Sequence, residues 1–283
     1  MVEVTFYGTR GSCPCAGDQY RVYGGNTACV GLTTDDGQPI ILDLGTGLRA
    51  LGAALDRSSA PTARPLQASV LLTHLHLDHV VGLPFFTPLR HPDSVLDIYG
   101  PKQPDGDLAD ALSALVQPPF FPIPLALLPG QIHCHDTVEQ DLAIGSATVR
   151  ARLVTHRGPT LGYRIEADGV SVAYIPDHEQ PAEPGEIDDR VLELCADVDV
   201  LIHDGQYTEA EQAARPHWGH STVAYAVRIA REAGARQLVL FHHDPAHGDA
   251  EVDRLRDRAQ ELAGPALAVS AAREGERLTP GRR

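Results

Sequence analysis

Residues 73–83 read THLHLDHVVGL and place four potential metal ligands, His74, His76, Asp78 and His79, within six positions. Imidazole and carboxylate groups are common ligands of zinc, iron and manganese in proteins. Four ligands so close in sequence point in different directions and cannot all saturate one ion. The stretch therefore predicts parts of two neighbouring metal sites, which need further ligands from elsewhere in the chain.

Three further candidate ligands each follow a β-rich run later in the chain: His156 after LVT, Asp177 after SVAYIP and His242 after QLVLF. Ends of strands meet at one edge of a sheet, where sites are usually built. We expect His156 to complete the set of His74 and His76. We expect His242 to join Asp78 and His79, with Asp177 bridging both ions. The sequence thus predicts two divalent ions, zinc first and manganese or iron as alternatives, which share a hydroxide as nucleophile.

The remaining chain has the same pattern of short strands and helices in two similar halves, about 1–140 and 141–283. Strands are predicted within 2–8, 28–34, 39–45, 69–74, 147–156, 161–169, 171–177, 197–204 and 237–243. Helices are predicted within 46–58, 221–234 and 249–264. Such a mixture favours an α/β fold in which two sheets pack together with helices outside. No linker rich in Ser or Gly separates the halves, so we expect a single domain over 1–283.

The charge of the chain disfavours a general nucleic-acid-binding surface. Its 23 Lys and Arg residues against 38 Asp and Glu residues give a formal net charge of -15. Neutralising a phosphate backbone requires clustered basic residues, so we expect a small-molecule partner. A small anionic substrate remains compatible if metal ions make one pocket locally positive.

The first residues and the apolar segments indicate neither export nor membrane insertion. MVEVTFYGTRGS reads as a strand and a turn rather than a signal peptide, which favours a cytoplasmic protein. In the most apolar stretch, 111–130, Pro118, Pro119, Pro122 and Pro124 forbid a continuous helix. It is interpreted as a helix end followed by an extended hydrophobic loop, used for packing or as a flap or subunit contact. The five cysteines are scattered and odd in number, so Cys13 and Cys15 are interpreted as ordinary thiols.

The pattern H-x-H-x-D-H, followed by a lone His, a strand-end Asp and a late His, resembles the metallo-β-lactamase-fold hydrolases. The resemblance extends from FYGTRGS through LDLGTG to AAREGERL. It implies a four-layered αββα sandwich with the metals at one sheet edge, Asp43 beneath the ligands, and a homodimer. No Cys stands at a ligand position, unlike in the true β-lactamases, and the HLH motif departs from the flavodiiron branch.

The tail RPHWGHSTVAYAVRIAREAGARQLVLFHHD is similar to the corresponding region of ribonuclease Z and related phosphodiesterases. The similarity implies that His220 contacts the scissile phosphate and protonates the leaving oxygen. Its partner would be Asp204, where ribonuclease Z has Glu. The alternative is that His220 caps its helix while Asp204 merely ends a strand. Asp78, His220 and Asp204 are the predicted catalytic residues.

The other histidines are expected outside the ligand set. His203 is an alternative partner near His220, and His217 and Trp218 are candidates to line a pocket. Neighbours of ligands or surface residues are expected at His133, His135, His178, His243 and His247.

The resulting hypothesis is a dinuclear metal-dependent phosphodiesterase acting on a small or cyclic phosphodiester. An RNA-processing activity is disfavoured because no insertion rich in Gly, Lys and Arg could hold tRNA. Two alternatives remain: hydrolysis of a lactone or thioester by the same metals, and a sensor that keeps metals without turnover.

Overall fold

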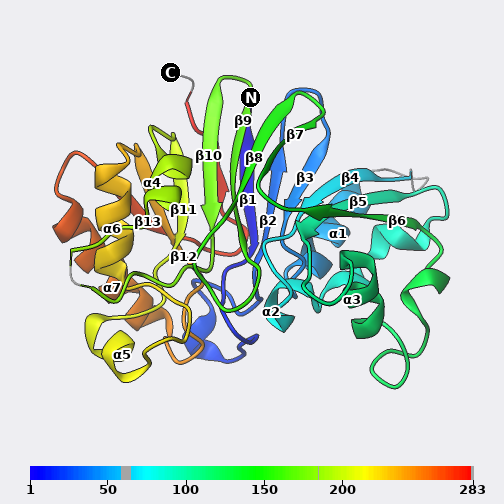
Figure 1. Ribbon diagram of the computed structural model, residues 1–283, viewed down its shortest axis with the longest axis horizontal. Helices are drawn as coiled ribbons and strands as arrows, with labels where there is room; N and C mark the ends of the chain where they lie inside the picture. The colour runs from blue at the N-terminus through cyan, green and yellow to red at the C-terminus, as the bar shows by residue number, and fades with distance from the viewer. Residues whose placement is uncertain (59–64, 184, 282–283) are drawn as a thin grey trace.

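Two seven-stranded β-sheets make up the centre of the computed structural model, which describes residues 1–58, 65–183 and 185–281 (Figure 1). The first has the order β14-β1-β2-β3-β4-β5-β6 and the second β13-β12-β11-β10-β9-β8-β7. The first comprises β1 (Glu3–Gly8), β2 (Cys29–Thr33), β3 (Pro39–Leu42), β4 (Gln67–Leu71), β5 (Val95–Pro101), β6 (Gln131–Thr137) and β14 (Arg277–Leu278). The second comprises β7 (Gln140–Ile144), β8 (Ala147–Leu153), β9 (Leu161–Ala167), β10 (Val170–Ile175), β11 (Val200–Asp204), β12 (Gln237–Phe241) and β13 (Ala268–Ala271).

Each sheet contains an antiparallel part and a parallel part. Strands β3 to β6 pair in parallel in the first sheet, and β10 to β13 pair in parallel in the second. The carboxyl ends of parallel strands share one edge of a sheet. The segments that leave β4, β10, β11 and β12 are thereby brought to sheet edges at which a site can form.

Helices cover the outer faces of both sheets and complete an αββα arrangement (Figure 1). The first sheet is covered by α1 (Leu48–Ser58), α3 (Leu108–Leu115) and the 3₁₀ turns η2 (Leu83–Phe85), η3 (Thr87–Arg90) and η4 (Leu125–Leu127). The second is covered by α4 (Asp189–Cys195), α6 (Val223–Glu232) and α7 (Asp249–Ala263). Shorter elements are η1 (Asp18–Tyr20), α2 (Leu77–Val80) and α5 (Glu209–Ala214). The predicted sandwich is therefore confirmed.

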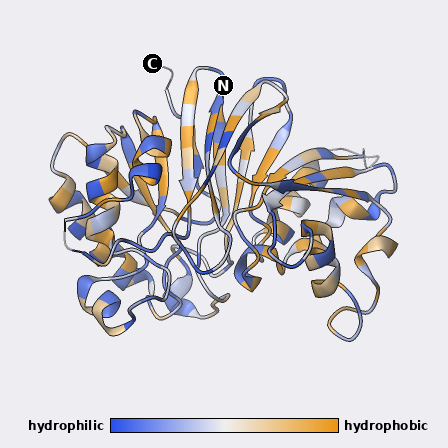
Figure 2. Cartoon of the chain, viewed as in Figure 1, coloured by the Kyte–Doolittle hydropathy of each residue, from blue (hydrophilic) through white to orange (hydrophobic). Residues whose placement is uncertain are grey.

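The main core lies between the sheets and follows from alternating side chains on their strands. In β8, Val149 and Ala151 are buried, while Thr148 and Arg150 between them are exposed. The buried residues join Phe6 and others from the first sheet in one apolar cluster. Burying one such aliphatic or aromatic side chain contributes about 1.5–3 kcal/mol. Figure 2 shows the apolar residues concentrated along the strands.

The predicted elements correspond closely to the observed ones. The three predicted helices are α1, α6 and α7, and each predicted strand region overlaps an observed strand. The predicted ranges do not include β5, β6, β7, β13, β14, α4 or α5. Edge strand β6 (QIHCHDT) has several polar residues. The C-terminal strand β14 returns to pair with β1, so the first sheet takes one strand from the second half.

The apolar stretch 111–130 has the predicted form. Helix α3 ends at Leu115, and an irregular segment with the turn η4 follows. Leu125 is buried, whereas Phe120 is 81% exposed. Among the residues described, no helix is both long and apolar enough to span a membrane.

Candidate metal centre

The predicted ligands converge from both sheets to one place. His74 follows β4, and the remaining ligands of THLHLDH lie on the short loop and on helix α2. His156 follows β8, Asp177 follows β10 and His242 follows β12. The structure thus brings all seven candidates together in two main groups, and a third overlapping set joins Asp177 and His242 to His220. Asp177 also contacts both groups.

The first group consists of His74, His76, His156 and Asp177, whose ligand atoms all lie within 4.8 Å of one another. Nδ1 of His76 is 2.9 Å from Nε2 of His74 and 3.2 Å from Nε2 of His156. Oδ2 of Asp177 is 3.7 Å from the His74 nitrogen and 3.5 Å from the His156 nitrogen. Tetrahedral zinc with nitrogen ligands at 2.0–2.1 Å separates its ligand atoms by about 3.3 Å, so these spacings suit one such ion.

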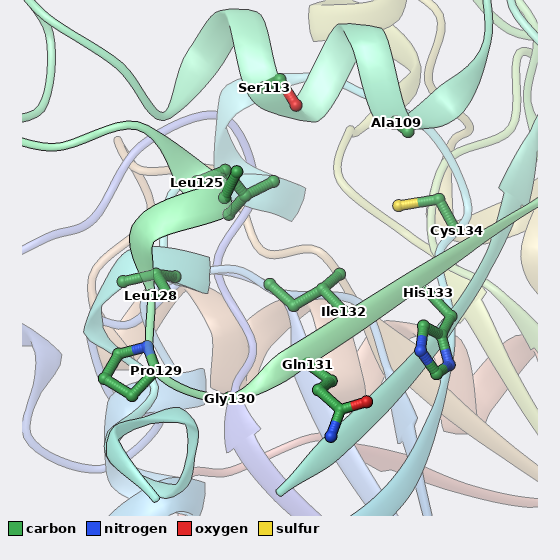
Figure 3. Close-up of a pocket in the computed structure, with 11 residues that line it drawn as sticks. Ala109, Ser113, Leu125, Leu128, Pro129, Gly130, Gln131, Ile132, His133 and Cys134 are labelled. Atoms are coloured by element: carbon green, nitrogen blue, oxygen red, sulfur yellow. The ribbon is translucent and has the colours of Figure 1, made fainter. Parts of the chain in front are cut away.

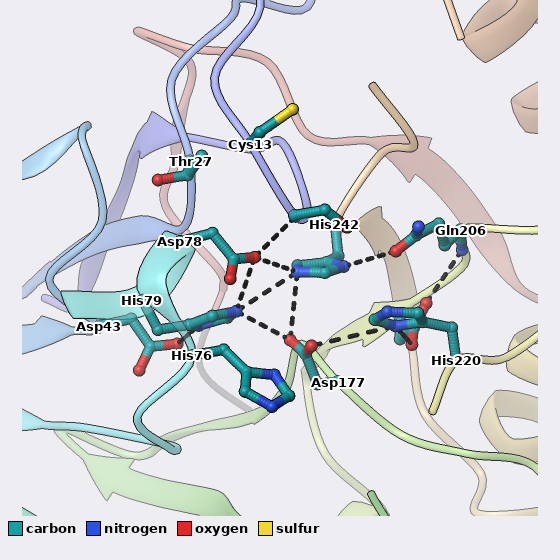
Figure 4. A network of polar contacts seen from close by, with 12 residues as sticks. Cys13, Thr27, Asp43, His76, Asp78, His79, Asp177, Gln206, His220 and His242 are labelled. Carbon is teal, nitrogen blue, oxygen red and sulfur yellow. Dashed lines mark hydrogen bonds and ion pairs between the residues drawn. The ribbon is translucent and has the colours of Figure 1, made fainter. Parts of the chain in front are cut away.

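The second group consists of Asp78, His79 and His242 (Figure 4). Oδ2 of Asp78 is 3.3 Å from Nε2 of His79 and 3.1 Å from Nε2 of His242. Oδ1 of Asp177 is 3.1 Å and 3.3 Å from the same two nitrogens. The two oxygens of Asp177 therefore face different groups, as a bridging carboxylate requires.

In three histidines, the Nδ1 atom lies on the side of the ring away from the ligand group. Its hydrogen bond sets the tautomer. Nδ1 of His79 donates to Oδ2 of Asp43 at 2.8 Å. Nδ1 of His242 donates to Oε1 of Gln206 at 2.8 Å, and Nδ1 of His156 donates to the Gly219 carbonyl at 2.6 Å. These partners only accept hydrogen bonds, so each Nδ1 carries the proton and each Nε2 presents a lone pair.

The donor set therefore fits cations. Imidazole nitrogens face one another at about 3 Å, and Oδ1 of Asp177 is buried with His79 and His242 as its ion-pair neighbours and no other polar partner among the described residues. Burial lowers the pKa of His74 well below its ordinary value, and neighbouring His79 lowers it further. Burial would raise the pKa of Asp177, but His242 and His79 hold it well below its ordinary range. Neutral imidazoles and an ionised carboxylate are the forms that bind metals.

The environment of His79 also attracts positive charge. Burial alone would lower its pKa, but Asp177, Asp78 and Asp43 raise it well above the ordinary value. The same three carboxylates would favour a divalent cation over that proton, because its charge is larger.

Asp43 supports this region from below, as the resemblance implied. Its carboxylate accepts from the main-chain nitrogen of Thr73 at 2.7 Å and from the Tyr174 hydroxyl at 2.8 Å, besides His79. The residue is fully buried and has a φ of 59° directly after β3. Such a network orients a ligand and raises its basicity.

His220 and Asp204 form a pair at the margin of the second group. Nδ1 of His220 lies 3.0 Å from Oδ2 of Asp204, and the His220 ring stacks on that of His242 with 5.0 Å between centroids. Main-chain nitrogens of Gln206, His178 and Ser221 donate to the Asp204 carboxylate. Burial would lower the pKa of His220, but Asp204 raises it to about 9.

The helix-cap alternative for His220 does not agree with the structure. The N-cap of α6 is Thr222, whose hydroxyl accepts from the main-chain nitrogen of Tyr225 at 3.1 Å. His203, the rival to Asp204, instead places its Nδ1 on the main-chain oxygen of Asp204 at 2.7 Å.

The remaining histidines lie outside both groups. His178 lies between His203 and Asp188, at 3.4 Å from each. Nε2 of His243 lies 3.0 Å from the Ala272 carbonyl, and Nε2 of His247 lies 2.7 Å from Oε1 of Glu211. His133 and His135 lie at the surface beside Asp97. Trp218 is 62% exposed on the turn before Gly219.

A cavity of about 480 Å³ at β6 contains none of the seven candidate ligands (Figure 3). It lies between α3, the end of the 111–130 segment and β6, and includes Leu125 and His133. The 111–130 segment therefore lines a pocket, but this pocket lies apart from the candidate metal ligands.

The sequence did not reveal two contacts to the second group. The main-chain nitrogen of Ser12, whose φ is 61°, donates to Oδ2 of Asp78 at 2.7 Å. Gln206 orients His242 from the segment after β11. The nearby Cys13 and Cys15 are free thiols. No local pattern signals such contacts, because they join segments far apart in sequence.

The two facing sheets and the His/Asp cluster define a metal-dependent hydrolase of the metallo-β-lactamase fold. A family model described as a β-lactamase superfamily domain matches residues 39–243, well over half of the chain. The chain belongs to this family, which confirms the resemblance drawn from its motifs.

Individual relatives agree with this assignment. The chain is 28% identical to a ribonuclease Z of Streptococcus suis over 315 residues, covering 92% of this chain and 95% of the relative. It has the fold of YhfI from Bacillus subtilis, with a TM-score of 0.72, 21% identity and 98% coverage of both chains. It also has the fold of a diphosphatase of the PhnP family, with a TM-score of 0.69, 19% identity, and coverage of 99% of this chain and 98% of the other.

Proposed function

We propose that this hydrolase is a dinuclear phosphodiesterase that acts on a small or cyclic phosphodiester. The observation that carries the proposal is the placement of the His220–Asp204 pair against the two metal-ligand groups. Two ions, of which zinc best suits the nitrogen-rich first group, would be held by the seven ligands named above. When bound, such ions activate water and neutralise charge on phosphate oxygens.

The protein's own residues would divide the remaining work. Asp177 spans the two groups and would keep the two metal positions at a constant separation. Asp43, Gln206 and the Gly219 carbonyl hold ligand rings in orientation. This prior ordering reduces the reorganisation needed when substrate binds.

His220 would serve as the general acid. Its Nδ1 donates to Asp204, which leaves the Nε2–H free to protonate the leaving oxygen when the P–O bond breaks. A pKa of about 9 keeps this proton in place at neutral pH. Cleavage of a phosphodiester with an alkoxide leaving group benefits from such an acid, because an alkoxide is a poor leaving group.

The relatives support phosphoester chemistry as the substrate class. One matched relative is named ribonuclease Z, and one structural neighbour is titled a diphosphatase. The net charge of -15 favours a small substrate over a long RNA. The proposal therefore favours a phosphodiester over a lactone or thioester, although the same ions could polarise a carbonyl.

The test compares two phosphodiesters with different leaving groups on the zinc-loaded protein and its His220→Ala variant. We expect wild-type protein to hydrolyse bis-p-nitrophenyl phosphate and a cyclic ribose phosphodiester. His220→Ala should lose ~10²–10⁴-fold in rate on the cyclic substrate. It should lose much less on the nitrophenyl ester, because nitrophenolate leaves without a proton.

Two results would contradict the proposal. Metal-loaded protein that cleaves neither ester, yet opens a lactone or thioester, would overturn the phosphodiesterase assignment. Equal losses on both esters would show that His220 binds the phosphate without acting as the acid.

A further inference from the structure

Gln206 contacts both chemically distinct parts of the site (Figure 4). It lies two residues after the end of β11 and is 2% exposed. Its side-chain Oε1 accepts from Nδ1 of His242 at 2.8 Å, and its main-chain nitrogen donates to Oδ1 of Asp204 at 3.0 Å. One residue thereby joins the last candidate metal ligand to the carboxylate that orients His220.

The direction of the Gln206 amide follows from its other neighbour. Nε2 of Gln206 lies 3.4 Å from Oδ2 of Asp244, a group that only accepts hydrogen bonds. The amide oxygen must therefore face His242, whose Nδ1 must donate. This leaves the Nε2 lone pair of His242 facing Asp78 and Asp177.

The backbone of His242 makes this support necessary. His242 has a φ of 59°, a left-handed backbone conformation that residues other than Gly rarely adopt. Its ring packs against Gly11, where an added Cβ would lie 2.3 Å from Nδ1. Among the described residues, Gln206 is the acceptor within hydrogen-bond distance of that Nδ1. A ring in so tight a place has one usable orientation, and Gln206 selects the tautomer that goes with it.

We propose that Gln206 is a positioning residue for the second metal position. It holds His242 in the tautomer and orientation that metal binding by Asp78, His79 and His242 requires, and it couples this ligand to the Asp204–His220 pair. The inference rests on the proposed dinuclear function, but it concerns metal affinity and can be measured without any substrate.

The experiment titrates metal-free protein with zinc alone, in competition with a chromophoric chelator. Wild-type protein should bind two zinc ions. Gln206→Met keeps the length of the side chain but removes the acceptor, so one of the two ions should bind ~10–100-fold more weakly. Gln180→Met is the matched control. The side-chain oxygen of Gln180 accepts hydrogen bonds from the main-chain nitrogen and the hydroxyl of Thr222, and Gln180 makes no contact with a candidate ligand. It should leave both affinities unchanged.

A double substitution separates the proposed role from a general packing defect. Gln206→Glu alone places a second carboxylate beside Asp244 and should weaken the same ion. Adding Asp244→Asn reverses the direction of the hydrogen bond between positions 206 and 244. The amide introduced at 244 can donate to the carboxylate introduced at 206, and that carboxylate still accepts from His242. We expect this pair of changes to restore wild-type zinc affinity.

The outcomes distinguish this inference from the proposed function. Identical zinc affinities for wild-type protein and Gln206→Met would overturn the role of Gln206, as would a double variant no tighter than Gln206→Met. Weakened binding in Gln206→Met, rescue by the double variant and no phosphodiester cleavage would support the role of Gln206 while overturning the proposed activity.

Discussion

At the residue scale, Asp204 reaches His220 although its side chain is shorter than that of Glu. The resemblance to ribonuclease Z implies Glu at this position, yet Oδ2 of Asp204 reaches Nδ1 of His220 at 3.0 Å. The contact is possible because the main chain closes around the carboxylate, with nitrogens of Gln206, His178 and Ser221 donating to it. These donors satisfy lone pairs of the buried carboxylate and hold it in place beside His220.

The neighbouring His203 predicts a pH dependence of stability. Burial lowers its pKa from an ordinary 6.5 to about 4. Between these values the unfolded chain binds a proton that the folded chain does not, so stability falls as the pH is lowered from 6.5 to 4. The loss from this residue should approach about 3 kcal/mol.

Urea unfolding between pH 7 and pH 4 measures this effect, with a chelator present to remove metal-linked protonation. His203→Asn keeps a donor for the Asp204 carbonyl but cannot titrate. Its free energy of unfolding should therefore fall less steeply with decreasing pH than that of wild-type protein. Parallel curves for the two proteins would show that His203 is not the responsible group.

At the element scale, the turn 215–219 holds His156, a member of the first candidate ligand group, through its main chain. Gly219 has a φ of 91°, and its carbonyl accepts from Nδ1 of His156 at 2.6 Å. Arg157 stabilises the same turn, because its Nε donates to the His217 carbonyl at 2.6 Å. The turn thus fixes His156 from the side opposite to its metal-facing nitrogen.

Gly219→Ala should damage this arrangement. An added Cβ would lie 2.5 Å from Nδ1 of His156, so the ring must move. We expect zinc binding at the first group to weaken ~10–100-fold, as is typical when a ligand loses its support. The measurement is zinc affinity by chelator competition, with circular dichroism to establish that the fold is retained.

Gly158→Ala provides the matched control. Gly158 is two residues from His156 and has a similar φ of 85°, but an added Cβ meets nothing within 4 Å. The two variants share the backbone cost of a side chain at positive φ. If both weaken zinc binding equally, backbone strain rather than contact with His156 is the cause.

At the scale of the whole molecule, the candidate ligands come from both sheets. His74, His76, Asp78 and His79 follow β4 of the first sheet, whereas His156, Asp177 and His242 follow strands of the second. Metal bound between them should therefore oppose separation of the sheets. The halves are expected to behave as one domain, a prediction that unfolding can also test.

Zinc should accordingly stabilise the folded chain by mass action. At a free concentration 100-fold above the dissociation constant, one ion raises the free energy of unfolding by about 2.7 kcal/mol. Thermal unfolding of metal-free protein should show a single transition, and its midpoint temperature should rise as zinc is added. Asp177→Ala, which removes the carboxylate shared by both groups, should show a much smaller rise. Two separate transitions in wild-type protein would argue against a single domain.

Much of the fold and of the grouping of the candidate ligands was predictable because the relevant signals are local. Alternating β-rich runs and the helical repeat of 221–234 depend on neighbouring residues only. The crowded THLHLDH motif predicts metal binding by the chemistry of its side chains. Edge strand β6 was harder to predict, because the polar residues that suit an edge weaken the pattern of a strand.

The sequence alone determined the class of chemistry, since His and Asp at strand ends are expensive to bury unless they bind something. Tertiary structure decided how these residues are paired. It directed the two oxygens of Asp177 to different groups, placed Asp204 rather than His203 on Nδ1 of His220, and brought Gln206 to His242. Such contacts depend on the register of parallel strands and on the direction of each ring nitrogen, and neither is encoded within a short stretch of chain.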